Sequence, residues 1–219
     1  MNARYTLIVG TKDWSSWSLR PYMALSAIGV PFAEELIPLR RDTTSEAVQR
    51  RTPAGRVPVL EIEESGRTHT VWDSLAICET LAERHPEAGL WPDDPYVRAE
   101  ARSYAAEMHS GFSDLREQLS MDFARVLPAP DLRDATKAQI ARILDSWTHA
   151  LTQHGGERGF LFGRFSIADC MYAPVCSRFR TYRIALPKLC ADYVARMFAL
   201  PGMIQWGKAA QAEVNRGEA

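Results

Sequence analysis

The sequence predicts an α/β N-terminal domain with a mixed four-stranded sheet, followed by an all-helical C-terminal domain. Short β-branched runs alternate with helical stretches at first, and strand patterns stop after a segment dense in Pro, Gly and Asp, HPEAGLWPDDP. Beyond it, apolar residues recur only at helical spacing. We therefore expect domains at residues 1–85 and 96–219, joined by a linker at residues 86–95.

The first domain should contain two strands around a helix, then a short helix, a hairpin and a last helix. Alternating apolar positions predict the strands, and apolar residues three or four positions apart predict the helices. This order describes a parallel unit followed by an antiparallel hairpin. The expected strands are residues 5–9, 32–39, 57–62 and 68–72, with a turn at 64–66, and the expected helices are 19–28, 44–51 and 74–84.

The second domain should contain five helices separated by Pro and Gly. A long first helix is expected because apolar residues recur at helical spacing almost without a break. The expected helices are residues 96–123, 134–152, 167–179 and 188–198, and a last one after Pro201.

Charge and composition exclude several classes of function. The chain has 26 Lys and Arg against 27 Asp and Glu, so it lacks the broad positive field of a nucleic-acid binder. No secretory signal and no apolar stretch of membrane-spanning length is found, which predicts a cytoplasmic protein that does not enter membranes.

Cysteine and histidine spacing argues against metal sites and disulfides. None of the four cysteines forms a C-x-x-C pair, and the five histidines lack metal-ligand spacing. Nucleotide-binding and hydrolase motifs are missing as well. We expect no metal and four buried free thiols, at Cys78, Cys170, Cys176 and Cys190.

The first candidate site is WSSWSLRP, directly after the first strand. Pro21 is tolerated only in the first turn of a helix, so the helix should begin near Trp17 or Ser18. Ser15 and Ser16 then lie at its start, where a hydroxyl and free backbone N–H groups can stabilise an anion. Ordinary N-capping by either serine is the alternative.

The second candidate site is TPAGRVPVL, which leads into the third strand. A cis bond before Pro58 would turn the Val57 N–H and C=O outward, where they could pair with a peptide backbone. A trans proline that only begins the strand is the alternative.

The third candidate site is the helix start in VWDSLAI. Ser74 and the helix N-terminus suit a carboxylate, and Asp73 suits an ammonium group, so one zwitterionic amino-acid head would satisfy both. Asp and Ser are also common caps. A further helix start, FSIAD, has the spacing of a capping box, with Ser166 and Asp169 in a structural role.

The order of SSWSLRP, GRVPVL, DSLAI and FLFGRFSIAD resembles the cytosolic glutathione transferases over essentially the whole chain. This resemblance implies a thioredoxin-like first domain, glutathione as co-substrate and a homodimer. The serines resemble the zeta and theta types. A zeta-like match makes Ser15 catalytic and is preferred, whereas a theta-like count from Arg20 selects Ser16. Trp17 replaces a cysteine of the zeta pattern, and disulfide reduction of the omega type is not expected.

The resemblance also implies ligand roles. Val57, next to Pro58, would pair with the cysteinyl backbone of glutathione, Asp73 and Ser74 would hold its γ-glutamyl head, and Arg56 or Arg41 would reach its glycyl carboxylate. An electrophile pocket would adjoin the first helix of the second domain. Its candidate residues are Tyr104, Met108, Phe112 and, for a substrate carboxylate, Arg178.

The expected activity is transfer of the glutathione thiol to small hydrophobic electrophiles. Two alternatives stay open. One is a glutathione-dependent isomerase of a maleyl-type diacid, which Arg178 favours and Trp17 disfavours. The other is a non-catalytic binding module built on the same fold.

Overall fold

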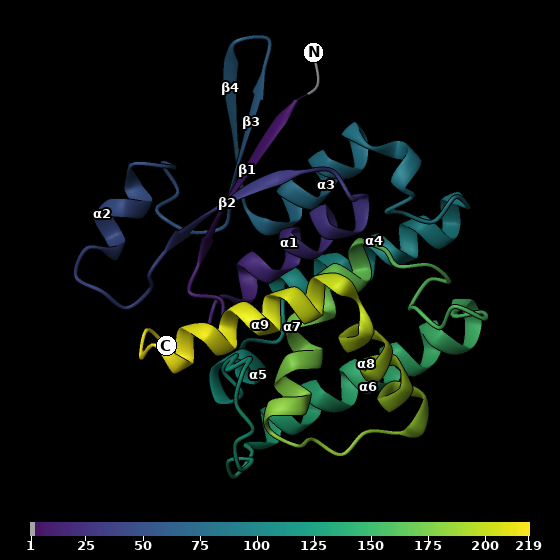
Figure 1. The fold of residues 1–219 in the computed structure, drawn as a ribbon. Helices are drawn as coiled ribbons and strands as arrows, with labels where there is room; N and C mark the ends of the chain where they lie inside the picture. The colour runs from purple at the N-terminus through teal and green to yellow at the C-terminus, as the bar shows by residue number, and fades with distance from the viewer. Residues whose placement is uncertain (1–2) are drawn as a thin grey trace.

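A computed structural model describes residues 3–219 of the chain and contains one mixed sheet. Its order is β2-β1-β3-β4. The central strand β1 (Arg4–Gly10) runs parallel to β2 (Phe32–Ile37) and antiparallel to β3 (Val59–Glu64), and β4 (Arg67–Trp72) pairs antiparallel with β3 at the edge. The mixed four-stranded sheet predicted from the sequence is confirmed (Figure 1).

Two strand ends follow from local backbone chemistry. The β2 strand stops at Ile37, before the predicted end at residue 39, because Pro38 has no N–H to continue a ladder. Ser65 and Gly66, which join β3 to β4, both have positive φ, at 52° and 75°. This combination is typical of the tight hairpin turn that matches strand twist.

Helices cover both faces of the sheet. Side chains of β1 alternate, so Leu7 and Val9 pack with α1 (Ser16–Ile28) and α3 (Ser74–Arg84), whereas Ile8 packs on the other face with Val48 of α2 (Thr44–Gln49). Figure 1 shows α2 on the side away from α1 and α3.

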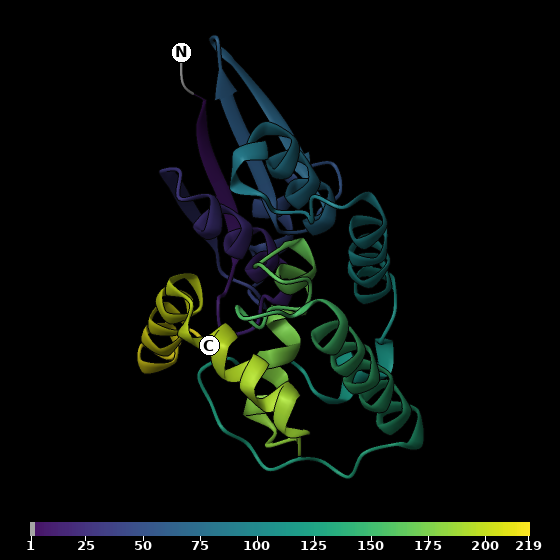
Figure 2. The ribbon, with the colours of Figure 1, turned by 90° about the vertical axis from the view of Figure 1, so that its right-hand side faces the viewer.

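The helical part of the chain lies below the sheet in Figure 2. It begins after a short 3₁₀ turn, η1 (Pro86–Ala88). Its helices are α4 (Pro95–Ser110), α5 (Ser113–Gln118), α6 (Asp134–His154), α7 (Ile167–Thr181), α8 (Lys188–Ala199) and α9 (Pro201–Asn215).

The prediction of one helix over residues 96–123 is wrong, because the chain turns between α4 and α5. Phe112 has a φ of 58°, in the left-handed region, and Gly111 precedes it in an extended conformation. A Cβ at Gly111 would lie 2.8 Å from the carbonyl oxygen of Glu107, so a glycine is needed there. Phe112 is buried, and burial of its ring offsets the unfavourable backbone.

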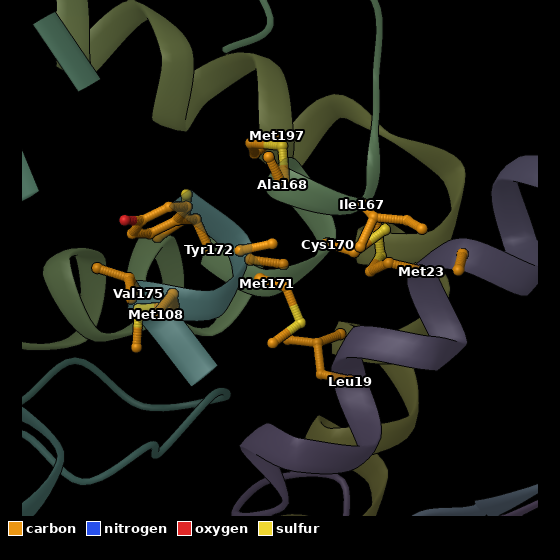
Figure 3. Packing of buried hydrophobic residues seen from close by; sticks show 14 of the residues in the cluster. Leu19, Met23, Met108, Ile167, Ala168, Cys170, Met171, Tyr172, Val175 and Met197 are labelled. Carbon is orange, nitrogen blue, oxygen red and sulfur yellow. The ribbon is translucent and has the colours of Figure 1, made fainter. Parts of the chain in front are cut away.

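The core joins the two parts of the chain through α1 and α7. Leu19 and Met23 of α1 face Ile167, Cys170 and Met171 of α7, and all five are at least 98% buried (Figure 3). All four cysteines are free and buried, as predicted. None of the helices within residues 3–219 has both the length and the apolar character needed to cross a membrane.

Asp169 anchors the start of α7 inside this core. Its Oδ2 accepts hydrogen bonds from the backbone N–H (2.8 Å) and the hydroxyl (3.0 Å) of Ser166, and its Oδ1 accepts from Leu161 N–H (3.2 Å) and the Tyr193 hydroxyl (3.0 Å). Burial of the carboxyl nevertheless raises the pKa of Asp169 to about 6. Between pH 4 and 6, the Asp169 carboxyl is therefore mostly protonated in the folded protein and mostly ionised in the unfolded chain.

This raised pKa predicts a pH-dependent effect of Asp169→Asn. Because the folded state binds the proton more tightly, the stabilising contribution of the Asp169 proton is fully present below pH 3.8 and is lost as the pH rises through 6. The free-energy difference between wild type and the variant should therefore shrink by about 2 kcal/mol from pH 4 to pH 6.5. Chemical denaturation at several pH values measures it, with Asp192→Asn on the exposed surface of α8 as control. If the difference in unfolding free energy between wild type and Asp169→Asn does not change with pH, the raised pKa of Asp169 is contradicted.

Candidate functional site

Sheet topology brings three loop segments to one edge of the sheet. Val59, at the start of β3, pairs with both Ile8 of β1 and Trp72 of β4. The loop after β1, the residues before β3 and the turn after β4 therefore meet there. These are the three segments that the sequence singles out.

A cavity of about 480 Å³ opens at this edge. Its volume lies within the roughly 300–1,000 Å³ typical of small-molecule sites. Most of its lining comes from the segments before β3 and after β4, with one residue each from α1 and α4. The lining residues are Trp17, Ala54, Arg56, Val57, Pro58, Trp72, Asp73, Ser74 and His109.

The two carboxylate oxygens of Asp73 have different partners, the start of a helix and a histidine. Its Oδ1 caps α3 by accepting from the N–H groups of Leu75 (2.9 Å) and Ala76 (3.2 Å). Its Oδ2 lies 3.1 Å from Nε2 of His109, on α4. The hydroxyl of Ser74 is 99% buried and has no hydrogen-bond partner among the described residues. A carboxylate oxygen and an unpaired hydroxyl are thus available side by side.

The segment before β3 presents free backbone groups to the cavity. The peptide bond between Val57 and Pro58 is cis. Across residues 3–219, no backbone group hydrogen-bonds the N–H or C=O of Val57, which precedes the first ladder pair of β3. Arg56 is exposed at the rim. Arg41 does not line the cavity, and its Nη2 donates to the carbonyl oxygen of Glu218 at 3.3 Å.

Ser15 and Ser16 stand at the N-terminus of α1 and make different hydrogen bonds. The Ser15 hydroxyl donates to Oγ of Ser18 at 2.7 Å, whereas Oγ of Ser16 accepts from Nη2 of Arg178 at 3.4 Å. Both serines are buried, and neither lines the cavity, although the next residue, Trp17, does.

The predicted helix start near Trp17 or Ser18 is wrong by one or two residues. The α1 helix begins at Ser16, which places Pro21 in its second turn. Pro21 cannot donate to the carbonyl four residues earlier, that of Trp17, so the helix loses one internal hydrogen bond there.

The loop between β1 and α1 is fixed by the helical part of the chain. The carbonyl of Asp13 accepts from Phe123 N–H at 3.0 Å, and the N–H of Asp13 donates to Oε2 of Glu213 at 3.0 Å. The indole of Trp206 donates to the carbonyl of Lys12 at 2.9 Å. Residues of α9 thus hold the segment that leads into the two serines.

Two arginines stack on Trp17, and the charge of a third, Arg178, acts on both of them. None of the three has a carboxylate partner within residues 3–219. The guanidinium carbon of Arg20 lies 4.1 Å from the Trp17 ring centre, and that of Arg116 lies 5.4 Å away. Burial, reinforced by the charge of Arg178, lowers the pKa of Arg20 to about 9, and burial with the charge of Arg116 lowers that of Arg178 to about 10. No nitrogen of the Arg20 guanidinium has a partner in the described part of the chain. This region carries a concentrated positive charge.

The expected electrophile-pocket residues lie elsewhere. Tyr104, Met108 and Phe112 are buried in the core, and the Tyr104 hydroxyl donates to the carbonyl of Ser146 at 3.1 Å. None of the three lines the cavity, and His109 is the α4 residue that does.

Sequence reasoning missed Arg20, Arg116 and His109. The three-residue spacing between Trp17 and Arg20 places them on one helix face and could have suggested their stacking. No comparable signal identifies His109 or Arg116, because His109 reaches the site through the packing of α4, and Arg116 lies on α5, after the turn at Phe112.

A larger hollow of about 880 Å³ lies at the opposite end of β1, between Arg4, Glu63, Arg84 and neighbouring side chains. None of the α-helices within residues 3–219 begins at this hollow, whereas α1 and α3 both begin at the smaller cavity. Within residues 3–219, no group of three His, Cys, Asp or Glu side chains could hold a metal ion.

Comparison with known proteins places the chain in one family. Residues 14–84 match the family model "Glutathione S-transferase, N-terminal domain", and residues 130–197 match "Glutathione S-transferase, C-terminal domain". Together the two matches cover more than half of the chain.

Relatives come from more than one class of that family. The chain is 29% identical to mouse glutathione S-transferase omega-1 over 63% of its own length and 55% of that protein. It is 27% identical to a Pseudomonas aeruginosa maleylacetoacetate isomerase over 78% of its own length and 81% of the relative. Several relatives, the mouse protein among them, are matched over less than two thirds of their length.

A solved structure with similar fold and sequence contains a ligand. The maleylacetoacetate isomerase of Anaeromyxobacter dehalogenans 2CP-1, solved with bound GSH in the active site, is 28% identical, with a TM-score of 0.66. The alignment covers 94% of this chain and 95% of that one.

Proposed function

Because this chain belongs to the cytosolic glutathione transferase superfamily, we propose that it activates the thiol of glutathione for attack on small hydrophobic electrophiles. The observation that carries this proposal is the cavity in which Val57, Asp73 and Ser74 meet beside the N-terminus of α1. Together the three segments offer partners for the head, the backbone, the thiol and the terminal carboxylate of one tripeptide.

The polar groups of the cavity are complementary to glutathione. The α-ammonium of the γ-glutamyl head pairs with Oδ2 of Asp73, and its carboxylate takes the unpaired hydroxyl of Ser74 at the start of α3. The cysteinyl backbone pairs with the free N–H and C=O of Val57, as an added strand would. Arg56 reaches the glycyl carboxylate from the rim.

Activation requires that the thiol be deprotonated near neutral pH. A free thiol has a pKa near 8.5, and lowering it by about two units requires roughly 2.7 kcal/mol of preferential stabilisation of the anion. A serine hydroxyl that donates to the thiolate supplies about 1.5–3 kcal/mol, and the positive end of α1 about 0.3–1 kcal/mol. The proton leaves to solvent, and the thiolate attacks the electrophile.

Two variants test the head-binding site. Asp73→Asn and Ser74→Ala should each weaken glutathione binding at least about tenfold, because each removes a charge-assisted contact. Isothermal titration calorimetry measures the affinity. Ser74→Ala should leave the thermal stability of the unliganded protein unchanged, since its hydroxyl has no partner.

Ser103→Ala, on the exposed face of α4, is the matched control and should bind like wild type. Failure of the wild-type protein to bind glutathione would refute the proposal. Binding without turnover of any electrophile would favour a non-catalytic binding module.

A second candidate, a glutathione-dependent isomerase of a maleyl-type diacid, is favoured by the buried arginines near Trp17. It would use their charge to hold substrate carboxylates, although Arg178 is 4% exposed and does not line the cavity. Chromatography of reactions with a neutral electrophile and with a maleyl-type diacid separates the two activities. The transferase proposal expects a stable conjugate from the electrophile and no cis–trans conversion of the diacid. Conversion of the diacid with glutathione recovered unchanged would support the isomerase instead.

We also propose that the protein forms a homodimer, as is expected for this family. The edge strand β4 is uncovered, and Trp72 at its end is 44% exposed, while Tyr96 of α4 is 85% exposed. Light scattering should give twice the chain mass in wild type, and Trp72→Arg combined with Tyr96→Arg should shift it toward the monomer. A monomeric wild type at micromolar concentration would contradict the proposal.

A further inference from the structure

The two serines at the start of α1 differ in where their hydroxyl hydrogens point. The hydrogen of Ser15 is directed to Oγ of Ser18, which also accepts from Gly10 N–H at 3.2 Å. Ser15 is thereby part of a hydrogen-bond chain that fixes the end of β1 to α1. Oγ of Ser16 instead accepts a hydrogen bond, from Arg178, and its own hydrogen remains available to another acceptor.

A hydrogen bond to the backbone orients the Arg178 guanidinium toward Ser16. Its Nε donates to the carbonyl of Leu119 at 2.7 Å, which fixes the plane of the guanidinium, and its Nη2 then reaches Oγ of Ser16. Its remaining nitrogen, Nη1, is buried and has no partner in the described part of the chain. A cation that donates to a hydroxyl oxygen polarises the O–H bond and makes that hydroxyl a stronger donor.

No carboxylate is paired with the arginines near Ser16 in the described part of the chain. Arg20 and Arg178 are 0% and 4% exposed, and within residues 3–219 neither makes a hydrogen bond or ion pair with a carboxylate. Among the described residues, Arg116 donates to the backbone carbonyls of Met108 and His109 and to no carboxylate. Buried cations without partners are costly, and an anion bound beside Ser16 would reduce that cost.

We propose that Ser16 is the hydroxyl that donates to the thiolate of bound glutathione, and that Arg178 is the positioning residue that orients it. The inference rests on the proposed function and makes it more specific. It differs from the zeta-like alignment, which selects Ser15. The thiol hydrogen leaves to solvent, the sulfur keeps the electron pair, and no covalent bond to the protein forms.

The serine variants provide the first test. The ultraviolet absorbance of the thiolate, followed against pH in protein saturated with glutathione, reports the thiol pKa directly. Ser16→Ala should raise this pKa by at least one unit, so that about tenfold less thiolate is present at pH 6. Ser16→Thr, which retains a hydroxyl, should restore most of the shift. Ser15→Ala should raise it by less than half as much.

The arginine variants test the positioning role. Arg178→Met should raise the thiol pKa as Ser16→Ala does, and Ser16→Ala combined with Arg178→Met should raise it no further than the larger single change. Arg180→Met is the matched control on the same helix. Arg180 is exposed, donates to the carbonyl of Phe123 at 2.7 Å and stacks on Phe198, so its loss should lower the melting temperature but leave the thiol pKa unchanged.

The outcomes separate this inference from the proposed function. If glutathione does not bind, or binds with an unshifted thiol, the proposed function fails. If wild type forms the thiolate and Ser15→Ala abolishes it while Ser16→Ala does not, only the present inference fails. Additive effects of the Ser16 and Arg178 changes would refute the positioning role. If Arg178→Met does not fold, Arg178→Lys replaces it, because lysine keeps the charge and most of the volume. A thiol pKa in Arg178→Lys that equals the wild-type value would also count against the positioning role.

Discussion

The packing of α1 against α7 determines the geometry of the site. The N-terminus of α1 carries the two serines and Trp17, and the side of the same helix that holds Leu19 and Met23 is buried against α7 (Figure 3). Arg178 projects from α7 to Ser16 across this contact. Because the interior is closely packed, a shift of either helix would move the serine relative to the arginine. One interface thus fixes both the packing of the core and the contact between Ser16 and Arg178.

Near this interface and in the adjoining cavity, the fold leaves several buried polar groups unpaired. The hydroxyl of Ser74, the guanidinium of Arg20 and one nitrogen of Arg178 are buried without partners in the described part of the chain. Each unpaired group costs about 1–3 kcal/mol, and a charged one more. Apolar packing elsewhere offsets this cost in the free protein. A ligand that pairs these groups gains the free energy that the fold does not recover by itself, which is consistent with the proposed binding of glutathione.

Local patterns in the sequence predicted where helices and strands lie better than they predicted which residues surround each side chain. The strands and most helices follow from apolar periodicity, and three candidate segments were found because each lies at a helix or strand start. The break at Phe112 was missed because tertiary packing of the ring overrides its backbone preference. Tyr104 and Met108 were placed in a pocket because periodicity identifies a buried face without saying what covers it. His109 and Arg116 act through contacts between distant segments, which a single sequence does not encode locally.

The hydrogen bond between Asp13 and Glu213 joins positions 200 residues apart, and it holds the loop that leads into the serines. Ribosomes add roughly 5–20 residues per second, so the loop is made about 10–40 s before its partner helix emerges. During that interval the sheet can form while the segment before α1 lacks its outer support. The loop that leads into α1 therefore gains its hydrogen bond to Glu213 only after almost the whole chain has been made.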